Sequence, residues 1–184
     1  MLGHGAGGRV TVYTIGHSTH PSGEFIALLQ QVRVDLVVDV RSFPRSRTNP
    51  QFNSDTLPAA LAPAGIGYLH LAALGGRRGR RAADSGNTLW RNDAFRNYAD
   101  YAMTAGFRAG LQELVALTRR HVCTLMCSEA VWWRCHRRII TDYLLAQGHS
   151  VAHIMGQGKV DAATLTPGAR PQPDGTVLYA TDGS

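Results

Sequence analysis

The sequence predicts one α/β domain, built on an open and largely parallel five-stranded sheet with helices on both faces, as in a Rossmann-like three-layer sandwich. Short apolar runs alternate along the chain with longer segments in which apolar residues recur every three or four positions. This alternation favours strands that are connected by helices. With 184 residues and 44% hydrophobic content, the chain can bury a substantial core within a single domain.

The five expected strands are short runs with few polar residues. The run 36–40 reads Leu-Val-Val-Asp-Val, and the run 122–126 reads Val-Cys-Thr-Leu-Met. Strands without a polar face are typical of parallel sheets, which helices cover on both sides. The remaining strands are expected at 10–15, 68–71 and 150–154.

Helices are expected between these runs. The first starts at Ser22, and others span about 55–61, 93–103 and 107–120. The last begins around Val131, because its apolar residues recur at helical spacing: Val131, Cys135, Ile139, Ile140, Tyr143 and Leu144.

Outside the expected domain, residues 10–156, the composition changes. Residues 1–9 are glycine-rich and are expected to be flexible. Residues 157–184 are rich in Gly, Pro, Thr and Asp, which predicts an irregular extension that packs on the domain or is partly mobile. Within the domain, a loop opens at Leu74, passes through Arg80 and Arg81 and continues to about Asn92. A loop of this length is usually functional or mobile.

The sequence favours a cytoplasmic protein that does not contact a membrane. No apolar run approaches the roughly 20 residues of a membrane span. The N-terminus has no apolar segment of the kind found in signal peptides. The three cysteines, Cys123, Cys127 and Cys135, are too few and too clustered for a secreted disulfide framework, so reduced thiols are expected. No cofactor is expected.

The chain carries a formal net charge of +6, and Lys159 is the single lysine among its 19 basic residues. Arginine favours bidentate contacts to phosphate and carboxylate groups. The charge is consistent with an anionic partner, either a small molecule or a nucleic acid, but also with a compositional bias toward arginine.

Open parallel sheets bind ligands beyond the carboxyl ends of their strands. Polar residues follow four of the expected strands, so they are expected to converge on one rim. The candidates for substrate or anion binding are His17, Ser18, Arg41, Arg45, Arg47, His70, Gly75, Gly76, Ser128, Arg134, His136 and Arg137.

The turn after the run 122–126 carries a thiol, Cys127, and a carboxylate, Glu129. The expected helix would then open with several arginines, although cations are disfavoured where free N–H groups already make a helix end positive. A bound anion would account for them, as would nearby acids. We therefore expect an enzyme that acts on a phosphate-bearing or other anionic substrate, with Cys127 or Glu129 as the catalytic residue.

Each candidate also has a structural interpretation. N–H groups and arginines would stabilise a Cys127 thiolate and hold its pKa below about 8.5, whereas buried cysteines also pack as small hydrophobes. Glu129 could pair with Arg41 or Arg137 instead of acting as a base. The same choice between acid–base chemistry and structural hydrogen bonding holds for three histidines: His17, His70 and His136.

Two other functions are compatible with the sequence. The first is a non-catalytic nucleic-acid-binding module, in which bases stack on Phe43, Trp90, Trp132 or Trp133. The second is a metal site. Its spacing matches no standard zinc pattern, and neighbouring residues point about 100° apart on a helix. Its ligands would be Cys127, Glu129, Cys135 and His136.

Seven motifs, in this order, resemble the domain of unknown function 488 family: residues 14–18, 39–47, 74–76, 95–103, 125–129, 135–137 and 151–154. The resemblance implies a cytoplasmic α/β domain found in bacteria and archaea, and it implies no reaction. The family commonly has a proline between the glutamate and the Cys-His-Arg motif, where this chain has Trp132-Trp133. Asp39-Val40-Arg41 is also similar to a strand end in rhodanese-like domains, which place a cysteine at a later strand end.

Overall fold

The computed structural model describes residues 10–79 and 83–182. The N-terminus, which the sequence predicts to be flexible, lies outside the described residues, as do Arg80 and Arg81 of the long loop.

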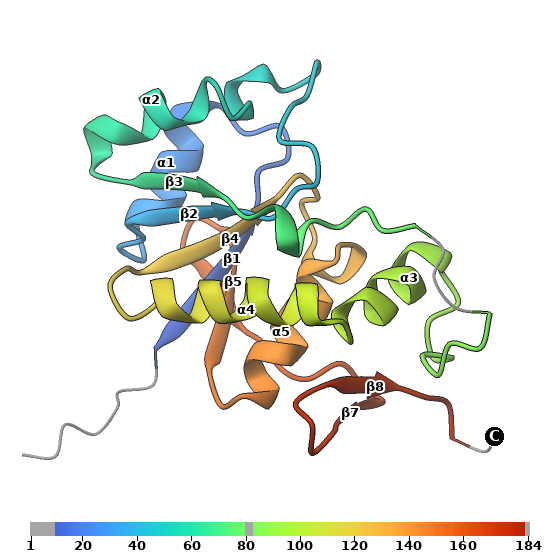
Figure 1. The fold of residues 1–184 in the computed structure, drawn as a ribbon. Helices are drawn as coiled ribbons and strands as arrows, with labels where there is room; N and C mark the ends of the chain where they lie inside the picture. The colour runs from blue at the N-terminus through green and yellow to red at the C-terminus, as the bar shows by residue number, and fades with distance from the viewer. Residues whose placement is uncertain (1–9, 80–82, 183–184) are drawn as a thin grey trace, which may run out of the picture.

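A six-stranded sheet forms the centre of the molecule, in the order β3-β2-β4-β1-β5-β6 (Figure 1). The strands are β1 (Thr11–Gly16), β2 (Leu36–Asp39), β3 (Gly67–His70), β4 (Cys123–Cys127), β5 (Ser150–Gly156) and β6 (Lys159–Ala162). All neighbouring pairs are parallel except β5 with β6. The predicted class, a largely parallel α/β sheet, is confirmed. The sixth strand was not predicted, because all four of its residues are exposed and no buried apolar pattern marks it.

Helices cover both faces of the sheet. They are α1 (Ser22–Gln30), α2 (Leu57–Leu61), α3 (Asp93–Ala102), α4 (Ala105–Leu117) and α5 (Arg137–Ala146). Short 3₁₀ turns lie between them: η1 (Pro50–Phe52), η2 (Ala62–Ala64), η3 (Ala72–Leu74) and η4 (Trp132–Arg134). In Figure 1, α1 and α2 lie on one side of the sheet, and α4 and α5 lie on the other.

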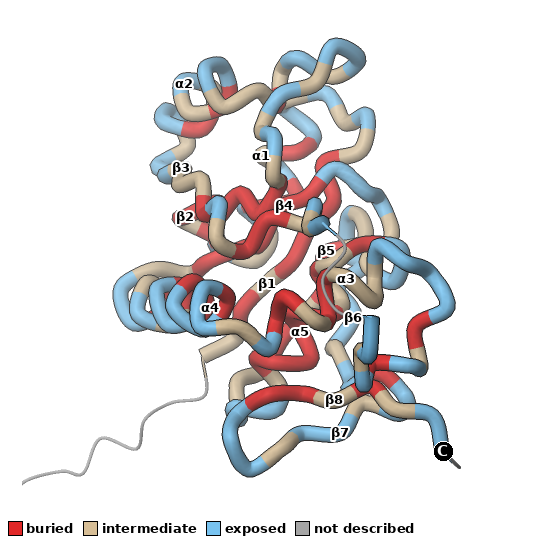
Figure 2. Tube along the Cα trace, turned by 45° about the vertical axis from the view of Figure 1, so that its right-hand side comes forward, coloured by how far each residue is buried: buried red, intermediate tan, exposed pale blue. Residues whose placement is uncertain are grey.

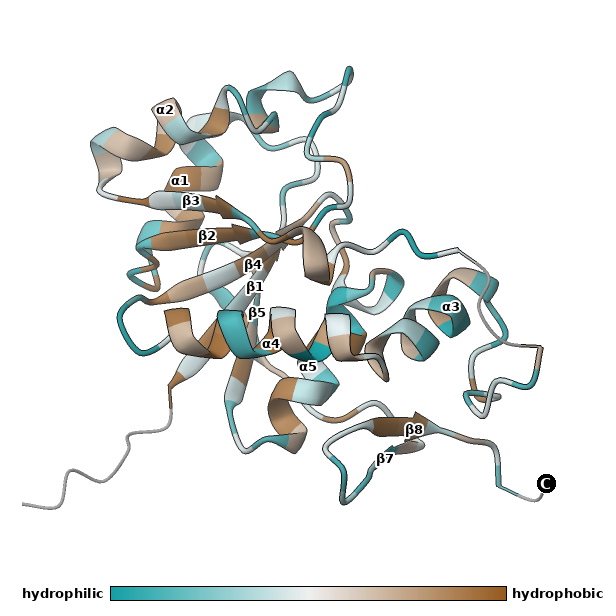
Figure 3. Ribbon diagram, viewed as in Figure 1, coloured by the Kyte–Doolittle hydropathy of each residue, from teal (hydrophilic) through white to brown (hydrophobic). Residues whose placement is uncertain are grey.

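Two separate cores result, because successive residues of a strand point to opposite faces. Val37 packs with α1 and α2, whereas the adjacent Val38 packs with α3, α4 and α5; both are fully buried. Buried residues accordingly concentrate in the central strands and in α5, while the outer side of α4 is exposed (Figure 2). Apolar residues are concentrated in the same strands (Figure 3).

The order of the strands creates a switch point beside β1. From β1 the chain crosses to β2 on one side of the sheet, whereas from β4 it crosses to β5 on the other. Beyond the strand ends the two loops continue to pair, because the N–H of His17 donates to the carbonyl of Cys127 and that of Ser18 to the carbonyl of Ser128. Only glycine fits at position 16, since a Cβ there would lie 1.8 Å from the carbonyl oxygen of Glu129.

The helix that was expected to begin around Val131 begins at Arg137 instead. The preceding chain forms η4 and then an extended residue, Cys135, with φ −133° and ψ 154°. Two contacts favour this path. The ring of Trp132 stacks on His153 of β5, with centroids 4.6 Å apart, and the Cys135 sulfur accepts the N–H of Arg137 at the start of α5.

The C-terminal residues form a hairpin of β7 (Ala169–Pro171) and β8 (Val177–Tyr179) that packs against α5 (Figure 1). The buried Tyr179 hydroxyl donates to Asp142 on that helix at 2.7 Å. Among the described residues, no helix has the length and apolar character needed to cross a membrane.

Candidate functional site

A cavity of about 440 Å³ lies beyond the carboxyl ends of β1, β2 and β4, at the switch point. Nine of the residues predicted to be catalytic or to bind the substrate line it: His17, Arg41, Arg45, Gly76, Cys127, Ser128, Glu129, Arg134 and His136. Eight others complete the lining: Ser42, Phe43, Ser46, Arg77, Ala94, Phe95, Tyr98 and Cys135.

Five further candidates do not line the cavity. Ser18 forms the loop pairing described above, in a left-handed conformation with φ 47°. His70 binds the carbonyl of Arg41 through Nε2 at 2.7 Å, and Gly75 permits a close approach to Ser42. Arg47 is exposed elsewhere on the loop after β2. Arg137 lies fully buried beneath the lining.

Two thiols form the floor of the cavity. Cys127 ends β4 and Cys135 follows η4, and their sulfur atoms lie 2.8 Å apart. They are 3% and 7% exposed. The sequence predicted a helical backbone at Cys135, whereas the backbone there is extended. This conformation turns the side chain in a different direction and makes the contact possible. The sequence pointed to both residues, but it did not predict that their sulfur atoms would be in contact.

Arg137 is the cation nearest to the two sulfurs. Its Nε donates to the Cys127 sulfur at 2.9 Å, and its terminal nitrogens donate to the Thr14 hydroxyl and to the carbonyl of Glu129. The Thr14 hydroxyl, which accepts from Arg137, is left to donate its own proton to Nδ1 of His153. All three nitrogens of the guanidinium are thus engaged within the protein, so Arg137 supports the thiols rather than offering a free group to a ligand.

The contacts of His136 define which of its ring nitrogens carries the proton and which faces Cys135. Its Nε2 lies 2.6 Å from the carbonyl oxygen of Val40, which can only accept, so Nε2 carries the proton. In the neutral ring, Nδ1 is then an acceptor, and it lies 3.5 Å from the Cys135 sulfur. Gly76 permits this placement, since a Cβ there would lie 2.5 Å from that nitrogen. His136 is therefore oriented to take the Cys135 proton.

The two thiols titrate as a coupled pair with opposite shifts. Burial opposes ionisation of Cys135, but the hydrogen bond from Cys127, together with His136 and Arg137, lowers its pKa well below the ordinary value. Burial and the neighbouring Cys135 raise the pKa of Cys127 well above it, with Arg137 opposing. The expected low pKa of Cys127 is therefore wrong. Cys135 is the thiol with the lowered pKa, because the Cys127 side chain, His136 and Arg137 all favour its ionised form.

Arg41 belongs to a buried ion pair. Its Nε and one terminal nitrogen donate to Asp39 at 2.9 and 2.7 Å, and the Tyr68 hydroxyl donates to the same carboxylate. The other terminal nitrogen lies 3.2 Å from Nε2 of His17. His17 donates Nδ1–H to the carbonyl of Ser18, so Nε2 is its acceptor. Burial lowers the pKa of His17 to about 4, and Arg41 lowers it too, so the ring is neutral.

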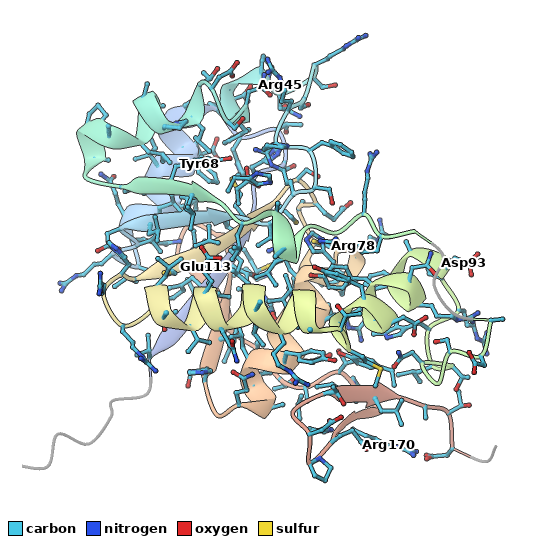
Figure 4. All side chains as sticks on the ribbon, in the orientation of Figure 1. Arg45, Tyr68, Arg78, Asp93, Glu113 and Arg170 are labelled. Atoms are coloured by element: carbon cyan, nitrogen blue, oxygen red, sulfur yellow. The ribbon has the colours of Figure 1, made fainter. Side chains whose placement is uncertain are left out.

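Exposed arginines surround the mouth of the cavity. Arg77 and Arg134 make no ion pair within the described residues. Arg45 lies at the outer surface (Figure 4) and its guanidinium pairs with Asp55 at 3.2 Å. Glu129 is the acidic residue in the lining, and its side chain is exposed. It makes no ion pair within residues 10–79 and 83–182, so the predicted pairing with Arg41 or Arg137 is not formed.

The residues proposed as metal ligands do not assemble. Glu129 contributes only its backbone carbonyl to the contacts of the pair. Across the part of the chain that the structure describes, no three His, Cys, Asp or Glu side chains converge in a way that could hold a metal ion.

Comparison with known proteins identifies the family of this chain and gives no activity or ligand. Neither the curated proteins nor the solved structures gave a match. A family model described as domain of unknown function DUF488 matches residues 22–144, which include β2, β3 and β4 of the central sheet and reach into α5. The match contains Arg41, Cys127, Cys135, His136 and Arg137, and therefore most of the cavity floor. The chain belongs to the DUF488 family.

Proposed function

We propose that this protein is a thiol-dependent enzyme that acts on a phosphate-bearing or other anionic substrate in the cavity at the switch point. The observation that carries the proposal is the pair of sulfurs, 2.8 Å apart, on the floor of a cavity whose mouth carries exposed arginines. A low-pKa thiol beside a base is the arrangement that activates a nucleophile.

The roles follow from the contacts. Cys135 is the nucleophile, because its proton can pass to Nδ1 of His136. The Cys127 sulfur lies 2.8 Å from that of Cys135, and the Arg137 guanidinium, which donates to Cys127, balances the charge of the pair. Arg77 and Arg134, which make no ion pair within the described chain, attract the anionic group of the substrate at the mouth.

A pair of alkylating reagents tests both halves of the proposal. Iodoacetate is an anion and iodoacetamide is neutral, so an arginine-ringed thiol should favour iodoacetate more than a free thiol does. Inorganic phosphate should slow the reaction. Arg77→Gln and Arg134→Gln should each reduce the preference, whereas Arg47→Gln, exposed and outside the cavity, should not. Equal preference in all variants, with no effect of phosphate, would refute an anion site.

Turnover is the second measurement. Thermal shifts with nucleotides, sugar phosphates and short oligonucleotides would identify a ligand class for kinetic assays. Any activity found should disappear in Cys135→Ser and persist in Cys123→Ser, since Cys123 lies at the opposite end of β4. Activity that survives Cys135→Ser would move the chemistry to another residue, with Glu129 the first alternative.

A non-catalytic nucleic-acid-binding module is the second candidate. Phe43 and Trp133 are 66% and 44% exposed, and the guanidinium of Arg77 lies 5.4 Å from the Phe43 ring centroid. Bases could stack on these rings. An oligonucleotide complex whose affinity falls steeply with salt would support this candidate, whereas tight binding of a mononucleotide with little salt dependence would favour the enzyme.

A further inference from the structure

We infer that Cys127 and Cys135 form a reversible intramolecular disulfide when the protein meets a hydroperoxide, which makes the cavity floor a two-electron redox site. The sulfurs would have to close by only about 0.75 Å to reach disulfide bonding distance. The inference does not rest on the substrate proposed above, because it requires only the two thiols and the oxidant.

Three features separate this pair from two cysteines that merely pack together. Both sulfurs line the cavity, so a small oxidant can reach them without unfolding of the protein. The Cys135 sulfur lies 2.8 Å from the Cys127 sulfur and 3.5 Å from Nδ1 of His136, contacts that favour its ionised form, and thiolates are the form that oxidants attack. Third, no third His, Cys, Asp or Glu side chain within the described chain joins them in a metal site that would protect them.

The chemistry balances with a hydroperoxide as the only co-reactant. The Cys135 thiolate attacks the terminal oxygen of the peroxide, the O–O bond breaks, and the leaving alkoxide or hydroxide takes a proton from His136 or water. Cys135 is then a sulfenic acid. The Cys127 sulfur attacks it, the S–O bond breaks, and the Cys127 proton leaves with the hydroxyl group as water. The two sulfurs are oxidised by two electrons in total, and the peroxide is reduced to an alcohol or water.

The disulfide would change the site in two ways. It removes the thiolate, so any chemistry that depends on Cys135 stops until a dithiol reduces the bond. It also removes the negative charge that Arg137 balances, leaving the buried guanidinium with Thr14 and the Glu129 carbonyl as partners. Cys123 remains outside the reaction, because its thiol lies at the other end of the strand and contacts the carbonyl of His121.

The sequence allows the bond to be assigned by mass spectrometry. Trypsin cleaves after Arg134 and Arg137, so Cys123 and Cys127 fall in peptide 121–134 while Cys135 falls in peptide 135–137. The full chain is treated with hydrogen peroxide, free thiols are blocked with iodoacetamide under denaturing conditions, and the digest is analysed without reductant. The expected product is peptide 121–134 joined to peptide 135–137, with one alkylated cysteine, and separated again by dithiothreitol.

Three variants decide the outcome. Cys123→Ser should retain the cross-link, and its fragment ions assign the bond to Cys127 without relying on any other variant. Cys127→Ser and Cys135→Ser should lose it. The inference is overturned if peroxide produces no cross-link, if the cross-link disappears in Cys123→Ser, or if Cys135 is oxidised to a sulfinic acid while Cys127 stays free to alkylate. The proposed enzyme could survive each of these results, because its test uses alkylation preference and turnover.

Discussion

Strand β4 begins with Cys123 and ends with Cys127, and the two thiols are 1% and 3% exposed. At the amino end, burial and the nearby Asp35 raise the pKa of Cys123 to about 12, and the sulfur contacts only a backbone carbonyl. At the carboxyl end, the strand meets a second thiol, a buried guanidinium and a histidine. Burial at the amino end raises the pKa of Cys123, whereas at the carboxyl end the neighbouring side chains lower the pKa of Cys135, the thiol that contacts Cys127.

Replacement of Arg137, at the carboxyl end of β4, should lower the free energy of unfolding much more than a replacement at the amino end of the strand. Arg137→Met removes the charge that balances the thiol pair and leaves the Glu129 carbonyl without its donor. Breaking a buried charge pair typically lowers the free energy of unfolding by about 3–5 kcal/mol. At the amino end, Asp35→Asn weakens a half-exposed pair with His121, and about 1 kcal/mol or less is expected. Urea unfolding of both variants measures the contrast, and similar losses would contradict it.

Asp39→Asn tests the second buried charge at the carboxyl ends. The carboxylate is fully buried and accepts from Arg41 and Tyr68. The amide would leave the Arg41 guanidinium without its counter-ion, at a loss of about 3 kcal/mol. Asp55→Asn is the matched control, because it removes an exposed pair with Arg45 that is worth about 1 kcal/mol at most. Equal midpoints for both variants in urea would mean that the buried pair is not stabilising.

Alkylation rates compare the thiols directly. At pH 7, Cys135 should react with iodoacetamide about tenfold or more faster than Cys123, because the pKa of Cys135 is lowered while that of Cys123 is raised. Peptide mapping after timed quenching gives the rate of each cysteine. If Cys127 is the fastest of the three, the thiolate has been assigned to the wrong member of the pair.

The smallest effect concerns acid stability. The pKa of His17 is lowered to about 4, so between about pH 6.5 and 4 the unfolded chain binds a proton that the folded protein does not. The stability that His17 contributes is therefore complete above pH 6.5 and decreases as the pH falls, by at most about 1.4 kcal/mol per pH unit for this one group. His17→Gln should flatten this part of the curve by the share that His17 contributes. Urea midpoints at pH 7 and pH 5 give the slopes.

Several features of this protein follow from the sequence alone. The apolar runs and helical repeats identify a largely parallel α/β sheet, and the rule that ligands bind beyond its strand ends leads to Cys127, Arg41, His17 and Gly76. These predictions succeed because strand burial and helix periodicity are local properties of the chain. Strand β6 was not predicted, since its four residues are all exposed and show no pattern of buried apolar positions.

The tertiary structure alone decided which thiol of the pair has the lowered pKa. In a continuous helix, Cys135 and His136 would point in different directions. The chain instead forms a 3₁₀ turn and an extended residue, which Trp132 stacking on His153 holds in place. That path places Cys135 against Cys127, and His136 against the carbonyl of Val40. His136 and Val40 lie 96 residues apart in the sequence, and Cys127 and Cys135 belong to two different local structures. A pattern that describes each segment by itself therefore contains no information about which side chains meet.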